Sequence, residues 1–282
     1  MQSIEQVQTG RRTAVAQVRP FQSLRYDPRF SFCAYVPQGF SAAPDRFRLL
    51  MGIHGSGRDA RELATALTQL ADASRYIVLA PLFPIGIVGD RNGDGYKYLT
   101  EPGIDYSAII EAVVAEFEGQ VGRKFPRFSL FGMSGGAQCA LRFSLVRPER
   151  IEAASIAAPG TITLPGDGRD WWLGTGDVQE RFGRPLDREA LRRVRFQLLV
   201  GALDLDVSEI LPQRSSAYAV PGADLGGTTR IDRLTTLSRA FTQLGIDHEC
   251  EFVAGVAHQL EPLLQRAFPF FRNVAAPAPA TP

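Results

Sequence analysis

The sequence predicts an α/β fold with a mostly parallel central sheet of about eight strands, helices on both faces and a short lid-like insertion. Two observations carry this prediction. Apolar runs of strand length alternate with segments of helical periodicity through the 282-residue chain. Polar residues suited to catalysis follow several of the apolar runs, which is where chemistry gathers in a parallel sheet.

The first half of the chain is expected to begin with an antiparallel edge strand, which Pro37-Gln-Gly39 ends. Asp59 and Glu62 have the spacing of a helix-capping pair. Ile109 and Val121 belong to an apolar series at helical spacing, which predicts a long amphipathic helix. In chain order the expected elements are strand 30–36, strand 47–53, helix 60–74, strand 76–80 and helix 104–121.

The second half continues the alternation and ends in a proline-rich tail. A strand that starts at Phe128 is followed by helix 137–146, strands 153–158 and 196–200, helix 232–244, a final strand and helix 260–271. We expect residues 1–272 to form a single domain and residues 273–282 to be a disordered tail.

Ser134 lies in the most informative segment of the chain. The spacing Gly132-x-Ser134-x-Gly136 after an apolar run and before a helical pattern is that of a nucleophile elbow. Glycines are needed on either side because side chains there would strike the neighbouring strand or helix. The serine then stands at a helix N-terminus, where backbone N–H groups favour a developing oxyanion.

A serine nucleophile needs a base, and the chain has three histidines. His258 follows the last strand and therefore lies at the edge of the sheet where chemistry is expected. His248 precedes that strand and lies at the opposite end. His54 follows an earlier strand in His54-Gly-Ser-Gly57 and is interpreted as a structural residue that shapes this loop.

The acid is expected after the buried strand that ends at Gly201. Asp204 comes first and is preferred, and Asp206 is the alternative. The resulting chain order of Ser134, Asp204 and His258 is the order used by the α/β-hydrolase fold.

With these residues the chain resembles α/β hydrolases, and within them the esterases grouped with polyhydroxybutyrate depolymerases and feruloyl esterases. The resemblance extends from about Phe30 to Phe271. It implies that the backbone N–H groups of Ser56 and Gly135 form an oxyanion hole. It also implies two-step acyl transfer on a carboxylic ester, without a cofactor.

Two insertions are expected to shape the pocket. Residues 158–190 form a lid or pocket wall, in which Trp171 and Trp172 either contact the substrate or only pack the loop onto the body. The segment Asp90 to Glu101 matches the ligand spacing of a calcium loop but lacks flanking helices. A metal there is left open, and the loop could instead line the active-site mouth with Tyr96 or Tyr98.

Charge, cysteine content and the length of apolar runs indicate which kinds of partner and compartment to expect. Lys and Arg number 31 against 30 Asp and Glu, so the net charge of +1 indicates no nucleic-acid partner. The widely spaced Cys33, Cys139 and Cys250 favour free thiols over a disulfide framework. No apolar run has the length of a membrane span, and the N-terminus lacks the apolar stretch of a signal peptide, so a cytoplasmic protein without a membrane partner is expected. The expected partner is a small-molecule or oligomeric ester, and the oligomeric state is not predicted.

The same three residues are also compatible with other functions. An acyltransferase, a thioesterase, or an amidase or peptidase would use the same three side chains. A hydrolase-fold binding protein without catalysis is the alternative from a different class.

Overall fold

The computed structural model describes residues 17–208, 210–213 and 216–275. The strands of the main sheet are β1 (Gln22–Ser23), β2 (Ser31–Tyr35), β3 (Arg48–Ile53), β4 (Tyr76–Leu82), β7 (Phe128–Met133), β8 (Ile151–Ala157), β9 (Arg195–Gly201) and β10 (His248–Val253). A separate hairpin pairs β5 (Thr100–Glu101) with β6 (Ile104–Asp105). The helices are α1 (Ala60–Ala66), α2 (Thr68–Ser74), α3 (Gly95–Tyr98), α4 (Tyr106–Val121), α5 (Gly135–Val146), α6 (Val178–Phe182), α7 (Arg188–Arg192), α8 (Arg230–Leu244) and α9 (Leu260–Ala275). Short 3₁₀ turns cover Phe40–Ala42, Pro44–Arg46 and Pro148–Arg150.

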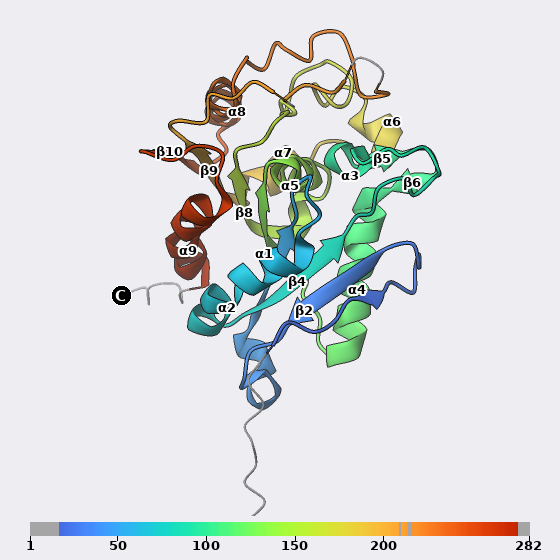
Figure 1. The fold of residues 1–282 in the computed structure, drawn as a ribbon, viewed down its shortest axis with the longest axis vertical. Coiled ribbons are helices and arrows are strands. Elements are labelled where there is room, and N and C mark those ends of the chain that lie inside the picture. The colour runs from blue at the N-terminus through green and yellow to red at the C-terminus, as the bar shows by residue number, and fades with distance from the viewer. Residues whose placement is uncertain (1–16, 209, 214–215, 276–282) are drawn as a thin grey trace, which may run out of the picture.

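The sheet confirms the predicted mostly parallel arrangement, but the strand expected at the antiparallel edge, β2, lies inside the sheet because β1 pairs with its outer side. Its eight described strands run in the order β1-β2-β4-β3-β7-β8-β9-β10. The pairings β1–β2 and β2–β4 are antiparallel, and every pairing from β4 to β10 is parallel (Figure 1). The carboxyl ends of β3, β7, β8, β9 and β10 therefore meet at one edge, and the loops that leave them are brought together there.

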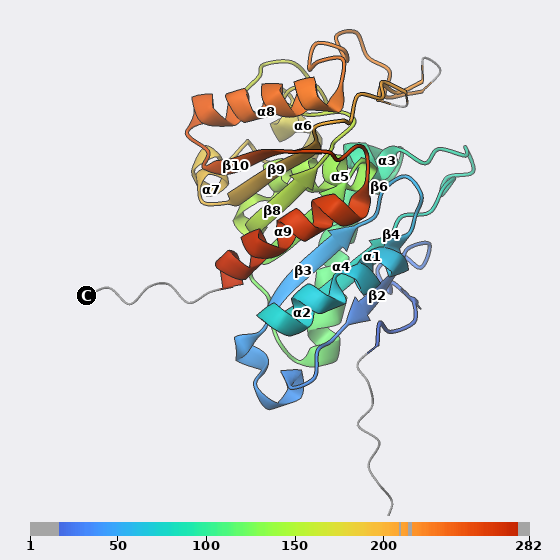
Figure 2. The ribbon, with the colours of Figure 1, turned by 60° about the vertical axis from the view of Figure 1, so that its left-hand side comes forward.

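Helices cover both faces, as expected for a parallel sheet. In Figure 2, α1, α2 and α9 lie on one face, and α4 and α5 lie on the other. The central strands are apolar on both sides for this reason, and all six residues of β7 are buried. Within the described residues, no helix combines the length and the apolar character that a membrane crossing requires.

Three local predictions need correction. The helix expected over 60–74 is interrupted at Leu67, whose ψ of −10° departs from α-helical values. Asp59 precedes α1 but makes no side-chain capping hydrogen bond, whereas Asp105 caps α4 by accepting from two backbone N–H groups. The last helix continues to Ala275, so residues 273–275 are helical, and the rest of the predicted tail lies outside the described residues.

Candidate active site

Ser134 occupies a strained strand-to-helix turn. It follows β7 directly and has φ 56° and ψ −117°, a conformation that side chains rarely adopt. A Cβ atom at Gly132 would overlap the carbonyl oxygen of Gly136, and one at Gly136 would overlap that of Ile53. The Ser134 N–H donates to the carbonyl of Ala157 at 2.9 Å, which fixes the turn to the end of β8. Both glycines are therefore required for the turn to pack, as the sequence analysis predicts.

His258 and Asp204 form a hydrogen-bonded pair at the same edge of the sheet. The His258 Nδ1 lies 2.7 Å from Asp204 Oδ2, and the Asp204 side chain is fully buried while that of His258 is 31% exposed. Since a carboxylate only accepts, Nδ1 donates and Nε2 is left free as a base. Gly201 permits this approach, because a Cβ atom there would overlap the carbonyl of Ala257.

The geometry selects Asp204 over Asp206 as the partner of His258. The Asp206 side chain is exposed and accepts from the N–H and hydroxyl of Ser208. These bonds, the hydroxyl of Ser208 included, lower the pKa of Asp206. His248 begins β10 and therefore lies at the opposite end of that strand from His258, as predicted.

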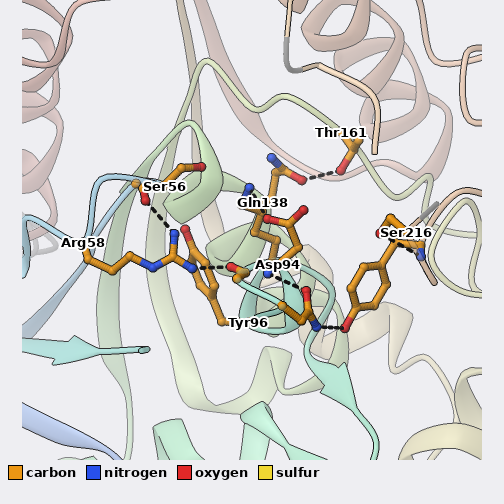
Figure 3. A network of polar contacts seen from close by, with 12 residues as sticks. Ser56, Arg58, Asp94, Tyr96, Gln138, Thr161 and Ser216 are labelled. Atoms are coloured by element: carbon orange, nitrogen blue, oxygen red, sulfur yellow. Dashed lines mark hydrogen bonds and ion pairs between the residues drawn. The ribbon is translucent and has the colours of Figure 1, made fainter. Parts of the chain in front are cut away.

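Ser56 and Gly135 lie side by side. Gly135 is the first residue of α5, so its N–H has no acceptor within the helix. An ideal Cβ atom at Gly135 would lie 3.3 Å from Ser56 Oγ, which places the loop after β3 against the start of α5. Figure 3 shows how Arg58 holds this loop, with its guanidinium donating to the carbonyl of Ser56 at 2.5 Å and to that of Gly93.

We expect a methyl group at Gly135 to impair catalysis. The Cβ atom of Gly135→Ala would overlap Tyr96 Oη and lie 3.0 Å from Lys97 Cε, so the start of α5 must shift relative to Ser56. Complete loss of one oxyanion donor lowers kcat about 100-fold or more. Because the Gly135 N–H is displaced rather than removed, we expect kcat to fall by about 10- to 100-fold. Steady-state ester hydrolysis measures it.

The control for this prediction is Gly119→Ala on α4, where a Cβ atom meets nothing within 4 Å. Adding Tyr96→Phe to Gly135→Ala removes the overlapping hydroxyl and should recover part of the lost rate. Unchanged kcat in Gly135→Ala would contradict the prediction.

His54 is a buried structural residue, consistent with its interpretation from sequence. Its Nδ1 lies 2.7 Å from the carbonyl of Gly55, and its Nε2 accepts from the N–H of Phe83 at 3.0 Å. One ring nitrogen is thus used by the backbone of the loop that carries Ser56, and the other by the backbone just after β4. Burial lowers the pKa of His54 to about 4.

This pKa predicts an acid-sensitive fold. Between about pH 6.5 and pH 4 the unfolded chain binds a proton at His54 that the folded chain does not, so stability falls as the pH falls. The loss between pH 7 and pH 4 amounts to about 3 kcal/mol from this group. Urea denaturation at both pH values should show a smaller loss in His54→Gln, whose amide oxygen can accept from Phe83. Equal losses in both proteins would contradict the assignment.

A cavity of about 680 Å³, lined by polar and apolar groups in similar measure, adjoins Ser56. One wall is the loop after β4 and includes Asp94 and Lys97, which form an ion pair at 2.6 Å (Figure 3). The other wall is the described part of the segment from Leu211 to Tyr218, which follows β9. Ser56 lines this cavity, whereas Ser134, Gly135 and His258 do not.

Sequence reasoning missed this second wall. About thirty residues separate Gly201 from α8, a length that could have marked the segment as an insertion. Tyr218 fixes it to the opposite wall by stacking on Tyr98 at 4.2 Å between ring centroids and by donating to the carbonyl of Thr100 at 2.8 Å. The insertion over 158–190 supplies none of the described residues that line the cavity.

The two tryptophans and Tyr96 pack the loops onto the body. Trp171 and Trp172 are buried, and their indole N–H groups donate to the carbonyls of Tyr98 and Tyr218 at 2.7 and 2.9 Å. Tyr96 is also buried, with its hydroxyl 3.3 Å from the carbonyl of His54 (Figure 3). These contacts favour the packing interpretation over substrate contact for all three side chains.

The segment from Asp90 to Glu101 does not gather oxygen ligands. Asp94 pairs with Lys97, and Glu101 is buried with one carboxylate oxygen accepting from the hydroxyl of Tyr106 at 2.6 Å. Across the described part of the chain, no group of three or more His, Cys, Asp or Glu side chains is placed to hold a metal ion. The loop lines the cavity beside Ser56, but neither Tyr96 nor Tyr98 is among the lining residues.

Comparison with known proteins establishes the fold. No family model matches the chain, and no curated protein matches it. Poly(aspartic acid) hydrolase-1 from Sphingomonas sp. KT-1 is 24% identical over 85% of this chain and 92% of that chain, with a TM-score of 0.67. The poly(3-hydroxybutyrate) depolymerase LpqC from Bordetella parapertussis is 21% identical over 89% and 86%, with the same TM-score. A ferulic acid esterase is 15% identical over 92% and 100%, with a TM-score of 0.61.

The chain therefore has the α/β-hydrolase fold, as the sequence predicts. A poly(3-hydroxybutyrate) depolymerase and a ferulic acid esterase, the two kinds of enzyme that the sequence resembles, are among the structures that share it.

Proposed function

We propose that this protein is a serine hydrolase that cleaves carboxylic esters through an acyl-enzyme intermediate. The observation that carries the proposal is the 2.7 Å hydrogen bond between His258 and the buried Asp204, at the sheet edge where Ser134 occupies its strained turn. A partly exposed imidazole oriented by a buried carboxylate is the arrangement that general-base activation of a serine needs.

In the proposed mechanism, His258 Nε2 takes the proton of Ser134 as the hydroxyl attacks the ester carbonyl. Asp204 holds the imidazole in the required tautomer and stabilises its charged form. The N–H groups of Ser56 and Gly135 stabilise the tetrahedral oxyanion, and one such donor is typically worth about 3 kcal/mol. His258 then protonates the leaving alcohol, and water hydrolyses the acyl-enzyme by the same route.

The cavity beside Ser56 favours a polar substrate. Its lining includes the Asp94–Lys97 ion pair and polar side chains such as Asn92 and Gln213, beside apolar residues such as Leu211 and Pro212. A long alkyl chain would strip water from these groups without replacing their hydrogen bonds. We therefore propose an ester whose acyl or alcohol part is short or carries polar groups.

Covalent labelling by a fluorophosphonate tests the proposal. Mass spectrometry of the digested protein should place the adduct on Ser134, and p-nitrophenyl acetate and butyrate should be hydrolysed faster than the octanoate. A protein that neither reacts with the probe nor hydrolyses any ester would refute the proposal and favour a binding role. Labelling without ester hydrolysis would keep the nucleophile and redirect the search to amides, thioesters or acyl acceptors.

Amide hydrolysis is the second candidate. It is favoured by the likeness to poly(aspartic acid) hydrolase-1, whose polymer is joined by amide bonds. The amine released from an amide is a poor leaving group. Its departure therefore depends more on protonation by His258 than the departure of p-nitrophenolate from an ester does. Comparing matched ester and amide substrates of one acyl group decides between the two.

A further inference from the structure

We infer that Arg58 is a positioning residue that holds the Ser56 N–H in place as an oxyanion donor. This inference rests on the proposed function, which assigns that N–H to the oxyanion hole. Ser56 is exposed in a tight turn after β3 that runs from Gly55 to Arg58. An exposed turn with a glycine at position 57 needs further contacts to keep one backbone geometry, and Arg58 supplies them.

The peptide group before Ser56 is fixed through the carbonyl of Gly55. This carbonyl accepts from the backbone N–H of Arg58 at 3.3 Å and lies 2.7 Å from His54 Nδ1. The C=O and N–H of a trans peptide point in opposite directions. Holding the Gly55 carbonyl inside the turn therefore directs the Ser56 N–H out of it.

The peptide group after Ser56 is fixed by the side chain of Arg58, whose Nη1 donates to the Ser56 carbonyl at 2.5 Å. Gly57 lies outside the positive-φ region, but a glycine can enter that region at little cost, and the central peptide of the turn would then flip. The flip would break the bond from Nη1, so this bond stabilises the observed orientation. With both flanking peptides held, neither φ nor ψ of Ser56 changes freely.

The guanidinium of Arg58 is itself anchored to the loop after β4 (Figure 3). Its Nη2 donates to the carbonyl of Gly93, and its central carbon lies 5.4 Å from the centroid of the Tyr96 ring. Tyr96 is buried and packs on His54 at 5.1 Å between ring centroids. Arg58 has a φ of 61°, a conformation that side chains rarely adopt, and it uses both its backbone and its side chain to join the exposed turn to this buried cluster.

Arg75 provides a matched control. It has the same left-handed backbone, with φ 56°, and it is exposed between α2 and the start of β4. Because β3 and β4 are parallel, Arg75 lies at the opposite edge of the sheet from Ser56. Arg58→Ala and Arg75→Ala remove the same side chain from the same kind of backbone, so any general cost of the substitution should appear in both.

The first measurement is steady-state hydrolysis of p-nitrophenyl acetate. The backbone N–H at position 58 remains in Arg58→Ala, so the donor is loosened rather than lost. We expect kcat to fall by about tenfold and KM to change by less than about threefold. Arg75→Ala should change neither constant. A wild-type kcat in Arg58→Ala would overturn the inference.

Gly93→Ala tests the same clamp from the other loop. A Cβ atom at Gly93 would lie 2.7 Å from Arg58 Nη2 and 3.3 Å from Ile85 Cγ1, so it displaces the guanidinium without removing it. Gly93→Ala should lower kcat in the wild-type background and should add little to the loss in Arg58→Ala. Equal losses in the two backgrounds would show that Gly93 does not act through Arg58 and would contradict the inference.

Nitrogen-15 relaxation of the Ser56 amide separates this inference from the proposed function, because it reports backbone order rather than turnover. The order parameter should fall from about 0.85 to about 0.6 or below in Arg58→Ala and should stay unchanged in Arg75→Ala. A wild type that hydrolyses no ester would count against the proposed function, whereas this loss of order would still support the positioning role. An unchanged order parameter in Arg58→Ala would overturn that role whether or not the protein is active.

Discussion

Ser134→Ala should lower kcat/KM for p-nitrophenyl esters by about three or more orders of magnitude. The hydroxyl forms the covalent intermediate, so removing it leaves only the contribution of the oxyanion donors and binding. The fold should survive because alanine lacks only the Oγ and the strained backbone at this position is held by the close packing of Gly132 and Gly136. Steady-state kinetics measures the loss of kcat/KM, and thermal unfolding shows whether the variant keeps its fold.

Ser144→Ala is the matched control, because it removes a buried serine hydroxyl from the same helix, one that donates to the carbonyl of Ala140 at 2.8 Å. It should keep the wild-type rate within a small factor. A Ser134→Ala protein that folds and retains more than about a tenth of the activity would rule out Ser134 as the nucleophile.

Asp204→Asn should lower kcat by about 10⁴-fold, whereas Asp206→Asn should change it by less than about threefold. An amide can donate to His258 Nδ1 and so favours the tautomer in which Nε2 carries the proton and cannot act as a base. The exposed side chain of Asp206 bonds only within its own turn to Ser208. Kinetics of the two variants above neutral pH separates them.

The buried guanidinium of Arg230 pairs with the Asp204 carboxylate at 3.1 Å. Asp204→Asn leaves this positive charge unpaired, so a lower melting temperature of the variant is expected. The assay temperature must therefore lie well below the unfolding transition of the variant. Equal losses of activity in Asp204→Asn and Asp206→Asn would reopen the choice between the two acids.

Residues whose role follows from strand order and local spacing could be predicted from the sequence. Gly132 and Gly136 mark positions where the backbone of the turn packs too closely against neighbouring backbone for a side chain to fit, and the spacing of the turn alone predicts this. Asp204 and His258 follow apolar runs, and parallel strands deliver such residues to one edge. The helix break at Leu67 lies beyond this kind of reasoning, since no proline or glycine marks it in the sequence.

Contacts between distant loops could not be predicted. Arg230 lies two residues before the helix expected over 232–244, and only the folded chain brings its guanidinium to within 3.1 Å of the Asp204 carboxylate. Tyr218 lies in a segment without strong periodicity, so its position opposite Tyr98 has no local signature. The sequence left substrate contact and packing open for the tryptophan pair, and only the folded chain shows that both indole N–H groups donate to backbone carbonyls of neighbouring loops.

The stack of Tyr218 on Tyr98 has a consequence for how new specificities can arise on this scaffold. It clamps the two walls of the cavity to each other rather than to the sheet. Grafting only one wall from a homologous enzyme would break the clamp, so the two loops must be exchanged as a pair. The exchange must also keep Gly93 and Tyr96, because through them the loop after β4 contacts Arg58 and Gly135, so on this scaffold a change of substrate choice is constrained by the proposed oxyanion hole.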